Sequence, residues 1–265
     1  MMKKVRRVLL LFFIVVFIGS LINIINYQYE LKLEERRIEQ LKQNEFENPK
    51  RKDIVKENKQ QPKETKKPKE KQVLVQYKDL FQENSDLVGW IKIDNTTIDY
   101  PVMQTKDDPI FYIHRDWNKK DSITGLPLID ARCTLESENI IIYSHNMKNG
   151  SMFGSLKKYK DKSYYEKHKN IKFDTIYEEA EYQIIGVFLG KVYYDEKTSK
   201  DEFLYYNYIE LNSEKEFDEY IDNVEKLSLY DTGNMAKYGD KLITLCTCDY
   251  YTENGRFLVV AKRIQ

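Results

Sequence analysis

A cysteine and an arginine near the C-terminus are residues whose types and spacing could do chemistry. Residues 241–261 are predicted to form an apolar strand that ends at Cys248, a turn at Asn254-Gly255, and a second apolar strand that begins beside Arg256. A cation close to a thiol raises the fraction of thiolate, which is the nucleophilic form of cysteine. The pattern therefore indicates a cysteine nucleophile, which needs a histidine as its acid and base.

The chain has three histidines, and one of them stands at the end of a strand. The run 139–147 is typical of a buried strand and carries His145 at its end, a rigid position from which a side chain can reach into a cleft. His114 follows a helical stretch and His168 lies in a lysine-rich segment, so we expect both to be solvated surface residues. His145 is therefore the predicted partner of Cys248.

The three cysteines lack the spacing of a disulfide framework or a zinc site. Cys246 precedes Cys248 by two residues and faces the same side of the strand. It could be a small residue without a role, a second thiol in the cleft, or a redox partner, and we favour the first because a disulfide across one residue would be strained. Cys133 is predicted to be structural. No metal or organic cofactor is expected.

An apolar segment near the N-terminus is long enough to cross a membrane. Basic residues within 3–7 precede the uncharged run 8–25, which would span about 27 Å as a helix. No small-residue cleavage site follows this run, so we expect an uncleaved anchor rather than a cleaved signal peptide. The basic cluster predicts a single-pass topology with a cytoplasmic N-terminus and an extracellular remainder.

The sequence predicts three regions. Residues 1–26 form a cytoplasmic tail and transmembrane anchor, residues 27–72 a charged helix and then a disordered linker, and residues 73–265 the catalytic domain. The linker prediction rests on 48–72, which is rich in Pro, Lys, Glu and Gln and has almost nothing apolar to bury. The third region is acidic and lacks an arginine cluster, which argues against nucleic acid as a partner.

The third region contains many short strand patterns and few helical ones. The predicted strands are 89–93, 97–102, 126–130, 139–143, 171–175, 181–189, 242–247 and 257–262, and the predicted helices are 76–84, 107–113, 152–159 and 213–227. Helix 213–227 has the strongest apolar face, and Ser213 with Glu216 forms a capping box at its start. Such strands, with helices inserted irregularly among them, predict a mostly antiparallel β-barrel.

These residues together resemble the class B sortases, which are membrane-anchored cysteine transpeptidases of Gram-positive bacteria. The matching motifs are Tyr143-Ser-His-Asn-Met-Lys148, Thr244-Leu-Cys-Thr-Cys248, Arg256 and the segments 88–93 and 99–102. The resemblance extends from Tyr77 to the end of the chain. It implies a mostly β fold, a closed sortase-like barrel with inserted and flanking α-helices, preceded by the transmembrane helix. Cys246 and Ser144 depart from the hydroxyl residue and the glycine that are commoner in the family.

The resemblance also implies a reaction and the residues that perform it. Cys248 would attack a sorting motif of secreted proteins after its threonine, giving a thioacyl intermediate that is transferred to an amine of peptidoglycan or its lipid-linked precursor. His145 would exchange protons with the two amines, and Arg256 would stabilise the oxyanion or hold the substrate backbone. The substrate-binding residues that it implies are Asn146, Thr247, Cys246 and Tyr143. The implied location is the outer face of the cell membrane, toward the cell wall.

Two other functions stay open on the sequence alone. A hydrolytic cysteine peptidase could use the same three residues, and a non-catalytic cell-wall binding domain is disfavoured because all three are intact. The sorting motif, acceptor amine, substrate proteins and oligomeric state also stay open. We expect the segment 175–240 to set substrate choice, although packing is the simpler role of its aromatic residues. Its tyrosines of interest are Tyr193, Tyr194, Tyr205 and Tyr206.

Overall fold

A computed structural model of the chain describes residues 2–46, 71–193 and 202–265. The chain divides into two compact units, Met1–Glu47 and Asn48–Gln265. Most of the predicted linker, 48–72, lies outside the described residues. The boundaries of the three predicted regions stay a prediction.

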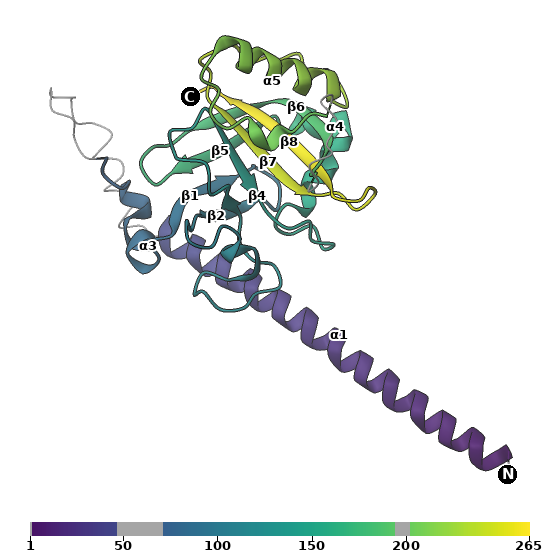
Figure 1. Cartoon of the computed structure of the whole chain (residues 1–265). Helices are drawn as coiled ribbons and strands as arrows, with labels where there is room; N and C mark the ends of the chain where they lie inside the picture. The colour runs from purple at the N-terminus through teal and green to yellow at the C-terminus, as the bar shows by residue number, and fades with distance from the viewer. Residues whose placement is uncertain (1, 47–70, 194–201) are drawn as a thin grey trace. The chain divides into compact units, whose positions relative to one another are not determined.

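The first unit is one helix, α1 (Met2–Phe46), drawn in purple in Figure 1. An 18-residue window within it reaches a mean hydropathy of 3.0, so by length and composition the helix can cross a membrane. The helix continues beyond the predicted end of the anchor because residues 26–46 contain neither proline nor glycine. The apolar run and the charged segment after it are therefore parts of one element.

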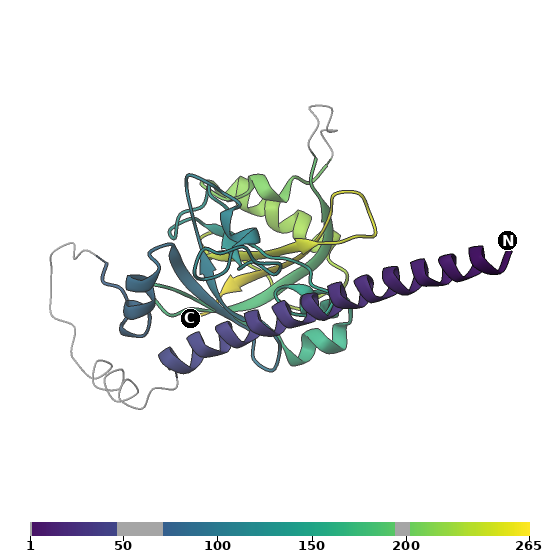
Figure 2. The ribbon, with the colours of Figure 1, turned by 90° about the horizontal axis from the view of Figure 1, so that it is seen from below.

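The second unit is built on a closed β-barrel (Figures 1 and 2). Its strand order is β1-β2-β3-β4-β7-β8-β6-β5. Every predicted strand is present, and β3 is shorter than predicted. Neighbouring strands are antiparallel except for the pairs β2 with β3 and β4 with β7, which are parallel. The strands are β1 (Leu87–Lys92), β2 (Asp99–Met103), β3 (Leu128–Ile129), β4 (Asn139–Tyr143), β5 (Asn170–Thr175), β6 (Glu181–Lys191), β7 (Leu242–Cys248) and β8 (Gly255–Arg263).

The longest helix of this unit lies on the outside of the barrel, against β6. The side chain of Ser213 caps α5 by accepting a hydrogen bond from the Glu216 amide, as the capping box predicts. Gly186 of β6 permits the close contact, because a β-carbon there would lie 2.4 Å from the Val224 side chain. The helices are α3 (Lys78–Glu83), α4 (Lys162–Lys167) and α5 (Glu214–Leu227), with 3-10 turns η1 (Val75–Tyr77), η2 (Phe111–His114), η3 (Gly154–Lys160) and η4 (Tyr205–Asn207).

Two helical predictions are wrong in type, and one helix was missed. Residues 107–113 and 152–159 were expected to be α-helical, but they yield only the 3-10 turns η2 and η3. Pro109 and Gly154 weaken α-helix at these places, since proline lacks an amide donor and glycine loses more backbone entropy than other residues. Helix α4 begins after Asp161, whose side chain caps it. This helix was not predicted because its short sequence is rich in charged residues.

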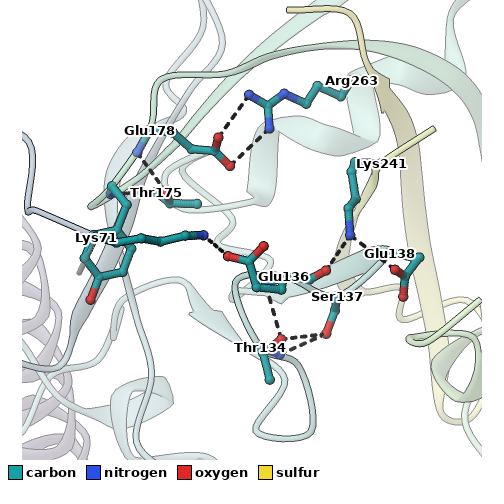
Figure 3. Close-up of polar contacts among 10 residues, drawn as sticks. Lys71, Thr134, Glu136, Ser137, Glu138, Thr175, Glu178, Lys241 and Arg263 are labelled. Carbon is teal, nitrogen blue, oxygen red and sulfur yellow. Dashed lines mark hydrogen bonds and ion pairs between the residues drawn. The ribbon is translucent and has the colours of Figure 1, made fainter. Parts of the chain in front are cut away.

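Polar contacts tie strand ends together at the end of the barrel where β4 and β7 begin (Figure 3). Lys241, just before β7, pairs with Glu138, just before β4, at 3.2 Å. Arg263 at the end of β8 pairs with Glu178 in the β5–β6 turn at 3.1 Å. Because β4 and β7 are parallel, both strands end at the opposite side of the barrel, where the predicted site lies.

Candidate active site

The strand register brings the three predicted catalytic residues to one end of the barrel. The parallel ladder between β4 and β7 pairs Tyr143 with Cys246, so the residues that follow each strand emerge side by side. On the other side of β7, the antiparallel ladder pairs Cys248 directly with Arg256. His145 follows β4 by two residues. Thiol, imidazole and guanidinium therefore come from three adjacent strands.

These residues line a cleft of about 540 Å³. Cys248, His145 and Arg256 all contribute to its walls. Of the predicted substrate-binding residues, Tyr143, Thr247 and Cys246 also line it, whereas Asn146 is absent from the lining within the described part of the chain. Apolar side chains make up much of the remainder, as is common in ligand-binding pockets. These are Pro109, Ile110, Ile113, Leu128, Ala131 and Val192.

The His145 imidazole is half-buried, and its Nε2 lies 2.9 Å from the main-chain oxygen of Ile113. A carbonyl oxygen can only accept a hydrogen bond, so Nε2 must carry the proton and Nδ1 is the basic nitrogen of the neutral ring. Burial lowers the pKa of His145, the bond to Ile113 opposes this shift, and neighbouring His114 adds to it. The lowered pKa favours the neutral, basic form of His145 at neutral pH.

His114 was predicted to be a solvated surface residue. It is exposed, but its ring centroid lies 5.4 Å from that of His145. The turn η2 brings His114 and the Ile113 carbonyl to the same imidazole. His168 is half-buried rather than solvated, since its ring stacks on Tyr164 at 4.1 Å.

The three thiols differ in their surroundings. All are free, and Cys248 is half-buried at the cleft while Cys246 and Cys133 are buried. Cys246 Sγ lies 3.3 Å from the hydroxyl of buried Tyr205. Burial raises the pKa of Cys246 to about 12 and that of Cys133 to about 12, so both stay protonated at neutral pH. The surroundings of Cys246 do not favour a second nucleophile.

Arg256 is half-buried, and its Nη1 donates a hydrogen bond to the Gly255 carbonyl at 3.0 Å. The same residue stands opposite Gly190 of β6, where a β-carbon would lie 2.7 Å from Leu258 and 3.3 Å from the Tyr205 ring. Tyr205 therefore packs closely on Gly190, the strand neighbour of Arg256. Arg256 holds a permanent positive charge on the strand beside Cys248.

The cleft wall contains an ion pair that was not predicted from the sequence. Arg132 Nε and Nη2 bind the two oxygens of Asp130 at 2.9 and 2.8 Å, and the Tyr143 hydroxyl donates to Asp130 at 3.1 Å. Burial raises the pKa of Asp130, but the hydrogen bonds from Arg132 outweigh it and hold that pKa below its usual value. Arg132 also donates to the carbonyl of Tyr206, which lines the cleft. The only sign of this ion pair in the sequence was the spacing of Asp130 and Arg132, which stand two positions apart at the end of a predicted strand.

Three further tyrosines were singled out in the segment 175–240, and they differ in their positions. Tyr205 is buried, Tyr193 is half-buried, and Tyr194 lies outside the described residues. Within residues 2–46, 71–193 and 202–265, no group of three or more His, Cys, Asp or Glu side chains could hold a metal ion.

Comparison with known proteins assigns the class. The family model described as "Sortase domain" matches residues 91–264, and the chain therefore belongs to the sortase family. It is 34% identical to sortase B of Listeria monocytogenes over 191 residues, which cover 71% of this chain and 73% of that protein. It is 29% identical to sortase B of Staphylococcus aureus over 192 residues, 71% of this chain and 74% of the relative.

Solved structures agree with this assignment. A Staphylococcus aureus sortase B–substrate complex is similar with a TM-score of 0.70 at 26% identity, covering 89% of this chain and 99% of that chain. A sortase B from Bacillus anthracis in complex with AAEK1 has a TM-score of 0.69 at 29% identity, with the same coverage of 89% and 99%. The chain is a class B sortase-type transpeptidase with the closed barrel of its family.

Proposed function

We propose that this enzyme is a membrane-anchored cysteine transpeptidase that cleaves a C-terminal sorting motif of secreted proteins after its threonine and joins them to an amine of peptidoglycan or its precursor. The observation that carries the proposal is the strand register, which sets Cys248 opposite Arg256 and brings His145 to the same cleft. Sortase B structures solved with a substrate and with triglycine support a peptide as donor and an amine as acceptor.

The proposed reaction has two half-reactions. Neutral His145 takes the proton of the Cys248 thiol at Nδ1, and the resulting thiolate attacks the threonine carbonyl carbon. The peptide C–N bond then breaks, and His145 gives this Nδ1 proton to the departing amine. The product is a thioester on Cys248 and a neutral imidazole. The incoming amine then attacks the thioester carbonyl, His145 Nδ1 takes the proton that the amine loses, and the thiolate leaves.

The N-terminal helix supplies the proposed location. A span of this length and hydropathy suits an uncleaved anchor, and the basic residues before it suit a cytoplasmic N-terminus. The catalytic domain would then face the cell wall, where its acceptor lies.

Arg256 is proposed to stabilise the negative charge that develops on the attacked carbonyl oxygen. We expect Arg256→Ala to lower kcat by about 10²- to 10³-fold, the usual effect of removing one oxyanion donor. Arg256→Lys should recover only part of this loss, since it keeps the charge but loses the planar fork. Steady-state kinetics of ligation measure both variants.

Arg263→Lys is the matched control, because Arg263 lies on the same strand at the end remote from Cys248 and pairs with Glu178. It should keep the kcat of the unmodified enzyme. A rise in KM with unchanged kcat in the Arg256 variants would assign Arg256 to holding the substrate backbone instead.

The function is tested with the full chain in detergent micelles. It is incubated with a panel of pentapeptide sorting motifs that vary around the threonine, with and without triglycine as the acceptor amine, and the products are identified by mass spectrometry. We expect a ligated product that depends on the amine. Free acid in the presence of abundant amine would identify a hydrolytic peptidase, and no turnover of any peptide would favour a non-catalytic wall-binding domain.

A further inference from the structure

One main-chain and two side-chain hydrogen bonds extend the parallel pairing of β4 and β7 beyond its regular end. The ladder closes at Tyr143 and Cys246, and the Ser144 amide then donates to the Cys246 carbonyl at 3.2 Å. The Thr247 hydroxyl donates back to the Ser144 carbonyl at 2.8 Å. One step further, Asn146 Nδ2 donates to the Cys248 carbonyl at 2.6 Å. Three hydrogen bonds thus join the segment that carries the base to the segment that carries the nucleophile.

Asn146 is a buried polar contact of the nucleophile itself. The residue is only 4% exposed. Its amide nitrogen must face Cys248, since a carbonyl oxygen accepts and cannot donate. The other end of the amide, Oδ1, is buried without a hydrogen-bond partner in the described part of the chain. A buried acceptor without a hydrogen bond destabilises the fold. The hydrogen bond from Nδ2 to the Cys248 carbonyl is thus made at the expense of an unsatisfied Oδ1.

The segment that carries Asn146 is also fixed from behind. Asn146 forms an antiparallel bridge with Met152, and the Phe153 amide donates to the His145 carbonyl at 3.0 Å. A displacement of Asn146 would therefore move His145 or release it from this bridge. The side chain acts between two constrained backbones rather than as a free surface group.

We propose that Asn146 is a positioning residue that holds the Cys248 backbone at a fixed place relative to His145, and that it does not bind the sorting peptide. This inference rests on the proposed function and replaces the substrate-binding role that the sequence suggested for Asn146. A thiol displaced by about 1 Å from its attack position costs on the order of 10²-fold in rate. Loss of the clamp should lower kcat by at least tenfold and leave KM within about twofold, because the cleft wall is unchanged.

The test uses Asn146→Asp and Asn146→Ala in the full chain. The aspartate has the same shape as asparagine, but its ionised carboxylate cannot donate to the Cys248 carbonyl and repels it. Burial raises the pKa of such a carboxyl, and its protonated form regains an O–H donor. The kcat of Asn146→Asp, divided by that of the unmodified enzyme at the same pH, should rise as pH falls from about 8 to about 5.5. The same ratio for Asn146→Ala should stay low and flat.

Asn149→Ala is the matched control. Asn149 lies in the same loop and is exposed, and its side chain accepts hydrogen bonds only from Ser151 among the described residues. This variant should keep both kcat and KM. Thermal unfolding of every variant identifies loss of fold, and if Asn146→Ala does not fold, the pH dependence of the isosteric Asn146→Asp alone decides.

The outcomes separate the two proposals. A higher KM with unchanged kcat, kcat equal to that of the unmodified enzyme, or a kcat ratio of Asn146→Asp that does not respond to pH would each overturn the positioning role. If the unmodified enzyme ligates no peptide, the proposed function fails. If it ligates and both Asn146 variants ligate equally well, only the positioning role fails.

Discussion

Cys248→Ala is expected to reduce ligation by at least about 10⁴-fold, since loss of a nucleophile removes the covalent route altogether. Of the three thiols, Cys248 alone is half-buried, and it pairs directly with Arg256. No thioester should form on the alanine variant. Mass spectrometry of the enzyme quenched with acid in the presence of sorting peptide measures the acyl adduct directly.

The other two thiols provide the comparison. Cys246→Ser should still form the adduct, because a serine hydroxyl can keep the contact with Tyr205 and the pKa of Cys246 is too high for a nucleophile at neutral pH. Cys133→Ala should also form it, since that buried thiol lies outside the cleft lining. An adduct that persists in Cys248→Ala and disappears in Cys246→Ser would reverse the assignment.

His145→Gln is expected to lower kcat by about 10²- to 10⁴-fold, the range typical of a lost general acid and base. Glutamine can keep the hydrogen bond to the Ile113 carbonyl through its amide, so the loss should report proton transfer rather than disrupted packing. His168→Gln is the control, because that ring stacks on Tyr164 on a different element. If His145→Gln keeps the rate of the unmodified enzyme, proton transfer by His145 is excluded.

The same variant should change the pH dependence of stability. Burial lowers the pKa of His145 in the folded chain below its value in the unfolded chain, so the unfolded state binds more protons between the two pKa values. The stability associated with neutral His145 is full above the unfolded pKa of about 6.5 and is lost as pH falls through the folded pKa. Chemical denaturation measures the free energy of unfolding at about pH 7.5 and about pH 5. Between these pH values, this free energy should fall less for His145→Gln than for the unmodified enzyme.

Local patterns were sufficient for the strands and for the residues at their ends. The segments before His145 and Cys248 predicted β4 and β7 because both are rich in apolar and β-branched residues. The parallel pairing of these two strands was not predictable in this way, since it depends on which strands become neighbours in the closed barrel. Periodicity predicted a mostly antiparallel barrel, and the resemblance to a known family added that this barrel is closed.

Contacts between residues distant in the sequence explain the features of the site that the sequence did not predict. His114 has no local partner in the sequence, yet the turn η2 sets it beside His145. Asn146 was expected to bind substrate because it follows the histidine in a motif, and that role stays a prediction; the sequence did not indicate that its side chain donates to the Cys248 carbonyl. Spacing along the chain indicates which residues lie at the end of a strand. The direction of each side chain there depends on the tertiary fold.

The parallel pairing of β4 with β7 also determines when the active site can exist. Thr247 and Ser144, which hydrogen-bond across this seam, are 103 residues apart in the sequence. A contact of such long range forms only after the intervening chain has been made and its closure entropy has been offset, so it is a late event in folding. A nascent or unfolded chain therefore carries a cysteine and a histidine that have not met. The site is therefore complete only when β7 and β8, the last two strands in the sequence, have joined the barrel.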